Sequence, residues 1–274
     1  MCRIAMYKGP AIPISKIVVE PPHSLVRQSY DAREMLSASS NADGFGIGWY
    51  HLNLSEKPAI YRNPAPITTD LNVPNMFNSI SGEIILAHVR GASDGMPISW
   101  TNTHPFSYHQ FLFMHNGSVD EFRTQIYPDF FPLIRPSVWD CIKGNTDSEH
   151  VFGLWLSNLD ENRLNDGDAF TLKEKTDALK KTILQLEELA AIKKTDIVLN
   201  IGLTDGHDLV AVRHHFGKRK ATLYYLENAE DFSGGHLVAS EKLFDDPNWK
   251  MIPEKSFLTI DRQNRLRIEP VHAD

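Results

Sequence analysis

The chain begins Met1-Cys2-Arg3-Ile4-Ala5-Met6, and this run constrains the fold more than any other. Its partly apolar residues predict a strand, and a nucleophile at its start would suit a first residue that faces a cleft. Methionine is usually removed before a small residue, which would leave Cys2 with a free α-amine beside its thiol. The ordinary pKa values are about 7.7 to 8.0 for the amine and about 8.5 for the thiol. Such an amine can activate its own side chain. Taken alone, however, a cysteine after the initial methionine is more often an incidental or packed residue, because free cysteine behaves mostly as a small hydrophobic side chain.

Composition excludes several classes of protein. The 274 residues include 28 Lys and Arg against 35 Asp and Glu, for a net charge of −7, and 42% are hydrophobic. These values predict a globular protein with a substantial core and argue against nucleic acid as a partner. Two cysteines, Cys2 and Cys141, cannot form a multi-disulfide framework and fit a reducing compartment. Neither a signal peptide nor an apolar run of 18 residues is evident, so the sequence predicts a cytoplasmic protein without a membrane partner.

The order of predicted elements favours a single α+β domain over residues 2–274. Helices are expected between strand-rich ends, which argues against a doubly wound parallel sheet, and no linker or repeat divides the chain. Helices are predicted at 24–36, 147–159 (capped by Asn145 or Thr146) and 171–191. Strands are predicted at 2–6, 45–50, 83–89, 111–114, 197–203, 209–214, 221–226, 236–240, 257–260 and 266–268.

Glycines alternate at Gly44, Gly46 and Gly48 in one predicted strand. Their spacing differs from the G-x-G-x-x-G pattern that opens a helix in dinucleotide-binding proteins. Two interpretations remain open, a strand closely approached by another layer or a strand that faces substrate.

Four further polar segments follow Cys2 in order. They are His88-Val89-Arg90-Gly91-Ala92-Ser93, Asn102-Thr103-His104-Pro105-Phe106, His115-Asn116-Gly117 and Thr146-Asp147-Ser148-Glu149. This set resembles the class II glutamine amidotransferases, which are N-terminal-nucleophile hydrolases. The resemblance is greatest to short stand-alone proteins of that group, which include glutathione-degradation subunits and the γ-glutamyl hydrolase of ergothioneine synthesis. The motifs span residues 2–155, and the β-rich part at 196–270 is similar too. The resemblance implies a four-layer αββα sandwich.

The resemblance also implies roles in binding a glutamine-like substrate. Arg90 would hold the α-carboxylate by paired charge-assisted hydrogen bonds, with the Ser93 hydroxyl assisting, and Asp147 would pair with the α-ammonium. A structural salt bridge is the alternative for Arg90. For Asp147 the alternative is a carboxylate that stabilises a helix N-terminus.

The remaining motif residues concern the reacting amide. By resemblance, Asn116 and Gly117 form the oxyanion hole, although Asn-Gly is also the commonest tight-turn dipeptide. His104 is expected to make a positioning hydrogen bond, with a core histidine as the alternative. The histidines at 88, 104, 109, 115 and 150 show no metal-ligand spacing, and the phosphate-loop pattern is absent. We therefore expect no metal and no cofactor.

The function expected from these residues is hydrolysis of a γ-glutamyl amide through a Cys2 thioester. Two alternatives stay open. The chain could be a glutaminase subunit that delivers ammonia to a separate synthase partner. If Met1 is retained, it could instead be a non-catalytic γ-glutamyl-binding subunit. The sequence does not choose among the leaving groups.

Overall fold

The computed structural model describes residues 2–35, 40–92 and 95–272 and contains two antiparallel sheets. The first sheet has the order β11 (Lys250–Met251), β9 (Tyr224–Ala229), β10 (Gly235–Ala239), β1 (Arg3–Pro13), β4 (Ser81–Val89), β2 (Phe45–His51) and β3 (Ser55–Asn63). The second has the order β13 (Leu266–Pro270), β12 (Ser256–Ile260), β8 (Leu209–Phe216), β7 (Ile197–Thr204), β6 (Phe111–Val119) and β5 (Phe106–Tyr108). β1 therefore lies inside its sheet, between β10 and β4.

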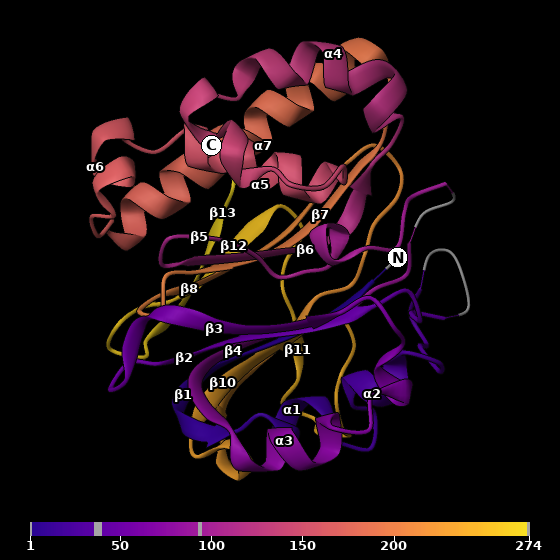
Figure 1. Ribbon diagram of the computed structural model, residues 1–274, viewed down its shortest axis with the longest axis vertical. Coiled ribbons are helices and arrows are strands. Elements are labelled where there is room, and N and C mark those ends of the chain that lie inside the picture. The colour runs from indigo at the N-terminus through magenta and orange to yellow at the C-terminus, as the bar shows by residue number, and fades with distance from the viewer. Residues whose placement is uncertain (1, 36–39, 93–94, 273–274) are drawn as a thin grey trace.

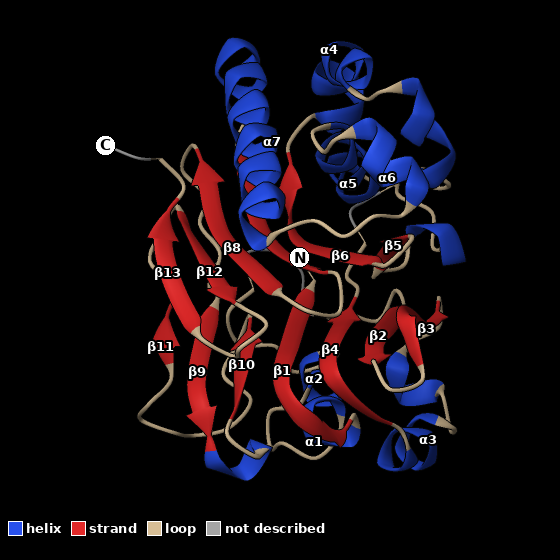
Figure 2. Ribbon diagram, turned by 90° about the vertical axis from the view of Figure 1, so that its left-hand side faces the viewer, coloured by secondary structure: helices blue, strands red, loops and turns tan. Residues whose placement is uncertain are grey.

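Helices cover the outer faces of both sheets (Figures 1 and 2). The first sheet carries α1 (Ser15–Val18), α2 (Leu25–Gln28) and α3 (Val73–Ser79). The second carries α4 (Tyr127–Phe130), α5 (Asp147–Ser157), α6 (Glu161–Asp166) and α7 (Leu172–Lys193). The expected α+β class and four-layer αββα sandwich are confirmed. Among the described residues, no helix has the length and apolar character needed to cross a bilayer.

Three apolar clusters fill the spaces between the four layers. One joins the first sheet to its helices and includes Ala5 and Tyr7 of β1. A second lies between the sheets and includes Ile4 and Met6. A third joins the second sheet to its helices. Alternate side chains of β1 thus enter different clusters, as the two-residue period of a strand requires.

Two predicted elements are displaced because side chains bind their backbone. The helix expected over 24–36 is described only as α2, since Asn41 binds the carbonyl of Gln28 and Glu241 binds the amides of Arg33 and Glu34. The strand expected from 221 begins instead at Tyr224, because the carbonyl of Ala221 accepts a hydrogen bond from the Arg213 guanidinium. Tertiary hydrogen bonds replace regular structure in both places.

The helices on the second sheet follow their sequence signals. Thr146 caps α5 by accepting a hydrogen bond from the amide of Glu149, at 3.2 Å. Thr171 and Glu174 form a reciprocal capping box at the start of α7. Both predicted helix starts are confirmed, and the α5 cap fixes where Asp147 lies.

The alternating glycines of β2 allow the two sheets to approach closely. A β-carbon at Gly46 would overlap the carbonyl oxygen of His104, and one at Gly48 would lie 2.6 Å from Cδ1 of Leu112. Both partners belong to the second sheet or to the segment that enters it. Of the two interpretations of these glycines, close approach by another layer accounts for Gly46 and Gly48.

Gly46→Ala is expected to reduce the free energy of unfolding by about 3 kcal/mol, because a backbone carbonyl must move to admit the methyl group. Gly48→Ala is the matched control, since it meets a movable leucine methyl and should cost about 1 kcal/mol. Urea denaturation of both variants measures the difference. Equal losses would show that the His104 segment yields as easily as a side chain.

Candidate active site

Strand alternation directs the candidate residues into the space between the sheets. Ile4, Met6 and Met114 belong to the inter-sheet cluster. Cys2 lies on the same side of its chain as Ile4 and Met6, and Asn116 lies on the same face of β6 as Met114. On β4, His88 follows Leu86 of the same cluster and lies opposite Ile4. The faces of β1, β4 and β6 that carry these residues therefore point into the space between the sheets. The start of β1 and the end of β4 lie near the end marked N in Figure 1.

Cys2 is partly buried beside the end of β4. Its Sγ lies 3.7 Å from the carbonyl oxygen of Gly91, within reach of a weak hydrogen bond. Burial raises the pKa of the Cys2 thiol, while the positive charges of Arg90 and Arg3 act in the opposite direction. The thiol thus lies against polar and cationic groups.

Arg90 follows β4 directly and is only 4% exposed. Its Nη1 donates to the carbonyl of Pro97 at 3.2 Å. Burial lowers the pKa of Arg90, and the charges of Cys2, Asp43 and Asp147 oppose that shift. Because the side-chain hydrogen bond found within the described residues uses a small part of its donor set, the guanidinium keeps donors for a carboxylate.

Asp43 holds the backbone around Arg90, a role that the sequence did not reveal. Its Oδ2 accepts from the amide of Ala92 at 2.8 Å, and its own amide donates to the carbonyl of Arg90 at 2.9 Å. The amide of Arg90 in turn donates to the carbonyl of Gly44 at 2.8 Å. Asp43 precedes the alternating glycines in the sequence, and nothing there distinguishes it from a turn residue.

Asp147 is the first residue of α5 and is tied to β6. Its Oδ2 accepts from the amide of Val119 at 2.8 Å, and its Oδ1 accepts from the amide of Ser148 at 2.7 Å. The carboxylate thus accepts backbone hydrogen bonds at the start of the helix, which agrees with the alternative interpretation that it stabilises the helix N-terminus. The Ser148 hydroxyl also donates to Oδ1, at 3.2 Å, so Oδ2 is the oxygen that retains a lone pair for an ammonium group. The charge of Asp147 acts on Arg90, so the two side chains lie near each other.

Asn116 and Gly117 lie inside β6, so the expected strand end at 114 and the alternative of an Asn-Gly turn are both wrong. Asn116 is fully buried, and within the described residues neither atom of its amide has a hydrogen-bond partner. Leaving such an amide unpaired costs about 1 to 3 kcal/mol, which makes a ligand-binding role the natural explanation.

The orientation of the Gly117 amide follows from the strand pattern. The amide of Val119, two residues later, donates to Asp147 and not to β7. Amides two residues apart in a strand point to the same side, so the Gly117 amide also points away from β7. On that side β5 pairs only with residues 111–113, which leaves the edge at Gly117 outside the β5 ladder.

The ring of His104 stacks on His88, with 4.1 Å between centroids, and packs against Phe106 at 4.4 Å. Burial lowers the pKa of His88 to about 3 and that of His104 well below its usual value, so both rings are neutral. Among the described residues no partner satisfies either ring nitrogen of His104, and its packing resembles that of a core histidine. Ser93, the other expected binding residue, lies outside the described residues.

Glu241 follows β10 and is buried with Arg3, the residue after Cys2. Its carboxylate binds Nη1 of Arg3 at 3.0 Å and Nε2 of His23 at 2.6 Å. Although burial acts against it, the hydrogen bond from His23, the backbone amides of Arg33 and Glu34, and the charge of Arg3 lower the pKa of Glu241 to about 2. Glu241 lies outside every motif identified in the sequence.

This pKa predicts a specific loss of stability in acid. A carboxyl with an ordinary pKa of 4.5 and a folded value of about 2 stabilises the fold above pH 4.5, and the contribution is lost as pH falls through 2. The difference corresponds to about 3 kcal/mol. Between pH 5 and pH 2, the wild type should lose about that much more unfolding free energy than Glu241→Gln. Parallel urea titrations across this range would contradict the assignment if both proteins lost the same amount.

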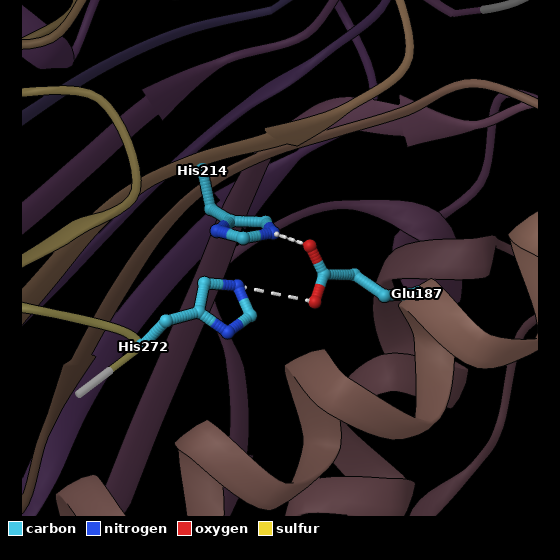
Figure 3. Close-up of side chains that lie close together, drawn as sticks. All are labelled: Glu187, His214 and His272. Carbon is cyan, nitrogen blue, oxygen red and sulfur yellow. Dashed lines mark hydrogen bonds and ion pairs between the residues drawn. The ribbon is translucent and has the colours of Figure 1, made fainter. Parts of the chain in front are cut away.

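A separate cluster joins α7, β8 and the segment after β13 (Figure 3). One oxygen of Glu187 accepts from Nε2 of His214 at 3.1 Å, and the other lies 3.2 Å from Nε2 of His272. Groups at this spacing can ligate a metal, but Nζ of Lys255 lies 4.0 Å from the same carboxylate and adds positive charge. Burial, together with Lys255, lowers the pKa of His214 to about 3. We interpret the cluster as polar contacts that fasten the last segment to α7.

Known proteins resemble this chain in sequence. Residues 24–241 match the family model of class-II glutamine amidotransferases. The chain belongs to this family. It is 31% identical to the probable glutamine amidotransferase DUG3 of Saccharomyces cerevisiae, over 97% of this chain and 83% of that protein. It is 37% identical to the gamma-glutamyl-hercynylcysteine sulfoxide hydrolase of Mycobacterium tuberculosis, over 96% and 94% of the two chains.

A solved structure agrees with the fold. The glutamine aminotransferase class-II domain protein from Silicibacter pomeroyi superposes with a TM-score of 0.72 at 24% identity, covering 99% of this chain and 100% of that one. The family resemblance drawn from the motifs is therefore confirmed. The chain is a class-II amidotransferase-like hydrolase related to γ-glutamyl hydrolase enzymes.

Proposed function

We propose that this single-domain class-II amidotransferase-like protein hydrolyses a γ-glutamyl amide bond, with Cys2 as an N-terminal nucleophile after removal of Met1. The observation that carries the proposal is Cys2 beside Arg90 where β1 starts, together with the buried, unpaired amide of Asn116 on the inter-sheet face of β6. Such a site offers a nucleophile, a cation and oxyanion donors, which are the groups that a γ-glutamyl amide requires.

In the first half of the proposed reaction, the free α-amine of Cys2 takes the thiol proton and the thiolate attacks the δ-carbonyl carbon. The side chain of Asn116 and the amide of Gly117 bind the negative oxygen of the tetrahedral intermediate. The bond from carbon to nitrogen breaks, and the leaving amine takes the proton from the α-ammonium. A γ-glutamyl thioester remains on Cys2.

In the second half, water gives a proton to the α-amine as it attacks the thioester. Glutamate leaves, and the proton returns to the Cys2 sulfur. Arg90, assisted by Ser93, holds the α-carboxylate throughout, while Asp147 pairs with the α-ammonium of the substrate. His104 stacks on His88 and stays in neutral form. No cofactor takes part in this scheme.

The relatives suggest the substrate class. The mycobacterial relative is named for a γ-glutamyl substrate, which leads us to place a γ-glutamyl compound with an organic leaving amine ahead of glutamine. The test compares glutamate release from glutathione, other γ-glutamyl thiol compounds and glutamine. Faster release from the γ-glutamyl compounds supports hydrolysis. Release of ammonia from glutamine alone would favour a glutaminase subunit with a synthase partner, and no release from any of them would favour a binding subunit.

A further inference from the structure

We propose that Glu241 is a positioning residue for the nucleophile, acting through Arg3 to fix the backbone of Cys2. This inference rests on the proposed function of Cys2. It also gives the part of the chain beyond the recognised motifs a role in the active site.

The backbone of Cys2 lies where strand pairing ends. The pairing of β1 with β4 begins at Arg3, and its pairing with β10 begins at Ala5. Ser240 extends the second pairing by donating its amide to the carbonyl of Ile4 at 2.9 Å and accepting the Ile4 amide on its hydroxyl at 3.0 Å. Cys2 comes before all of these contacts. Its position therefore depends on side chains.

Arg3 supplies the side-chain contact to Cys2. Its Nε donates to the carbonyl oxygen of Cys2 at 2.7 Å, and its Nη1 donates to Glu241 at 3.0 Å. The guanidinium is planar, so fixing Nη1 on Glu241 also fixes the direction of the Nε donor. The carbonyl held in this way belongs to the residue that carries the proposed nucleophile and base.

Glu241 is itself held from several directions. The backbone amide of Arg33 donates to both carboxylate oxygens, at 3.1 and 3.0 Å, and that of Glu34 donates to Oε1 at 2.9 Å. His23 binds the other oxygen. Arg3 and Glu241 are each about 1% exposed, so the Arg3 charge has this buried carboxylate as its ion-pair partner. An uncharged partner would leave a buried cation, which favours movement of the Arg3 side chain and release of the Cys2 carbonyl.

This arrangement predicts a defect in reaction rate more than in substrate binding. Misplacement of a reacting group by about 1 Å can cost about 10²-fold in rate. Arg90, Asp147 and Asn116 do not contact Glu241, so the binding of the substrate's α-groups should be retained. We expect Glu241→Gln to slow acylation of Cys2 by about 10²-fold, with little change in the concentration of substrate that half-saturates the protein.

The experiment measures the rate of the covalent adduct formed with 6-diazo-5-oxo-norleucine, by intact mass over time, as a function of reagent concentration. Only protein that lacks Met1 is scored, at a temperature where each variant is folded. Arg3→Lys is the second variant, because it keeps the buried charge beside Glu241 but lacks a planar fork that reaches Cys2 at the same time. It should retain most of the stability and still label about 10²-fold more slowly.

Asp205→Asn is the matched control. Asp205 is also a buried carboxylate paired with a cation, Lys175, and also accepts two backbone amides, from His207 and Asp208. It binds α7 to the loop between β7 and β8, and none of its hydrogen bonds involves Cys2 or Arg3. Its loss should lower stability without slowing the labelling of Cys2.

The outcomes separate the two claims. Slow labelling in Glu241→Gln and Arg3→Lys with rapid labelling in Asp205→Asn supports the positioning role. Wild-type rates in Arg3→Lys, or equal slowing in Asp205→Asn, would overturn it while leaving Cys2 as the nucleophile. If wild-type protein that lacks Met1 is not labelled on Cys2, the proposed function fails and the positioning role fails with it.

Discussion

Replacement of Cys2 by alanine is expected to lower kcat/KM for γ-glutamyl hydrolysis by about 10⁴-fold or more. The variant would lose the thiol that forms the thioester while keeping Arg90, Asn116 and Asp147 in place. Steady-state release of glutamate measures the loss. Because Cys2 is partly buried at the end of a strand, the fold should tolerate alanine there.

Cys141→Ala is the matched control for this prediction. Cys141 is the other cysteine in the sequence, and burial raises the pKa of its thiol to about 12, which keeps it protonated and unreactive near neutral pH. Its replacement should leave kcat/KM within about twofold of the wild type, since a thiol in that state contributes no nucleophile. Hydrolysis that survives in Cys2→Ala but is lost in Cys141→Ala would contradict the assignment of the nucleophile.

Asn116→Ala is expected to lower kcat by about 10²- to 10³-fold, as removal of one oxyanion donor typically does. The effect should fall mainly on kcat because the negative oxygen exists only in the transition state and intermediate. Stability should change little, since the wild-type amide is buried without a hydrogen-bond partner among the described residues. Kinetics and urea denaturation together measure this combination.

Asn158→Ala is the matched control and should lower stability without lowering kcat. The Asn158 amide lies at the end of α5 and donates to Thr182 at 3.0 Å and to Gln185 at 2.8 Å. Its removal should destabilise the fold by about 1 kcal/mol per lost hydrogen bond and leave kcat unchanged. Were Asn116→Ala to lose stability and keep its kcat, the amide would be a structural group and Gly117 would lack its proposed partner.

Local sequence signals predicted several strands and helices well where they agree with tertiary packing, whereas the four layers were implied by the family resemblance. Strands β2, β4, β7 and β12 are apolar and bounded by polar or turn residues, and α5 and α7 begin at threonine caps. Local propensity failed at α2, where side chains from distant elements take the backbone groups that a longer helix would use. Long-range hydrogen bonds of this kind leave no periodic signal.

The candidate site was predictable as a set of motifs but not as a geometry. Asn116-Gly117 has the composition of a tight turn, yet β7 pairs with both residues and keeps them in a strand. Glu241 shares no motif or spacing with Cys2, and only the pairing of β10 with β1 brings it to Arg3. The supporting residues come from strand neighbours that are far apart in the chain.

Intact mass spectrometry of the purified protein is the decisive test of Cys2 as an N-terminal nucleophile. The intact mass of the protein is measured before and after treatment with 6-diazo-5-oxo-norleucine, and Cys2→Ala is treated in parallel. We expect loss of Met1, one stoichiometric adduct localised to Cys2, and no adduct on the variant. Protein that has lost Met1 but acquires no adduct, or an adduct that persists in Cys2→Ala, would contradict this expectation.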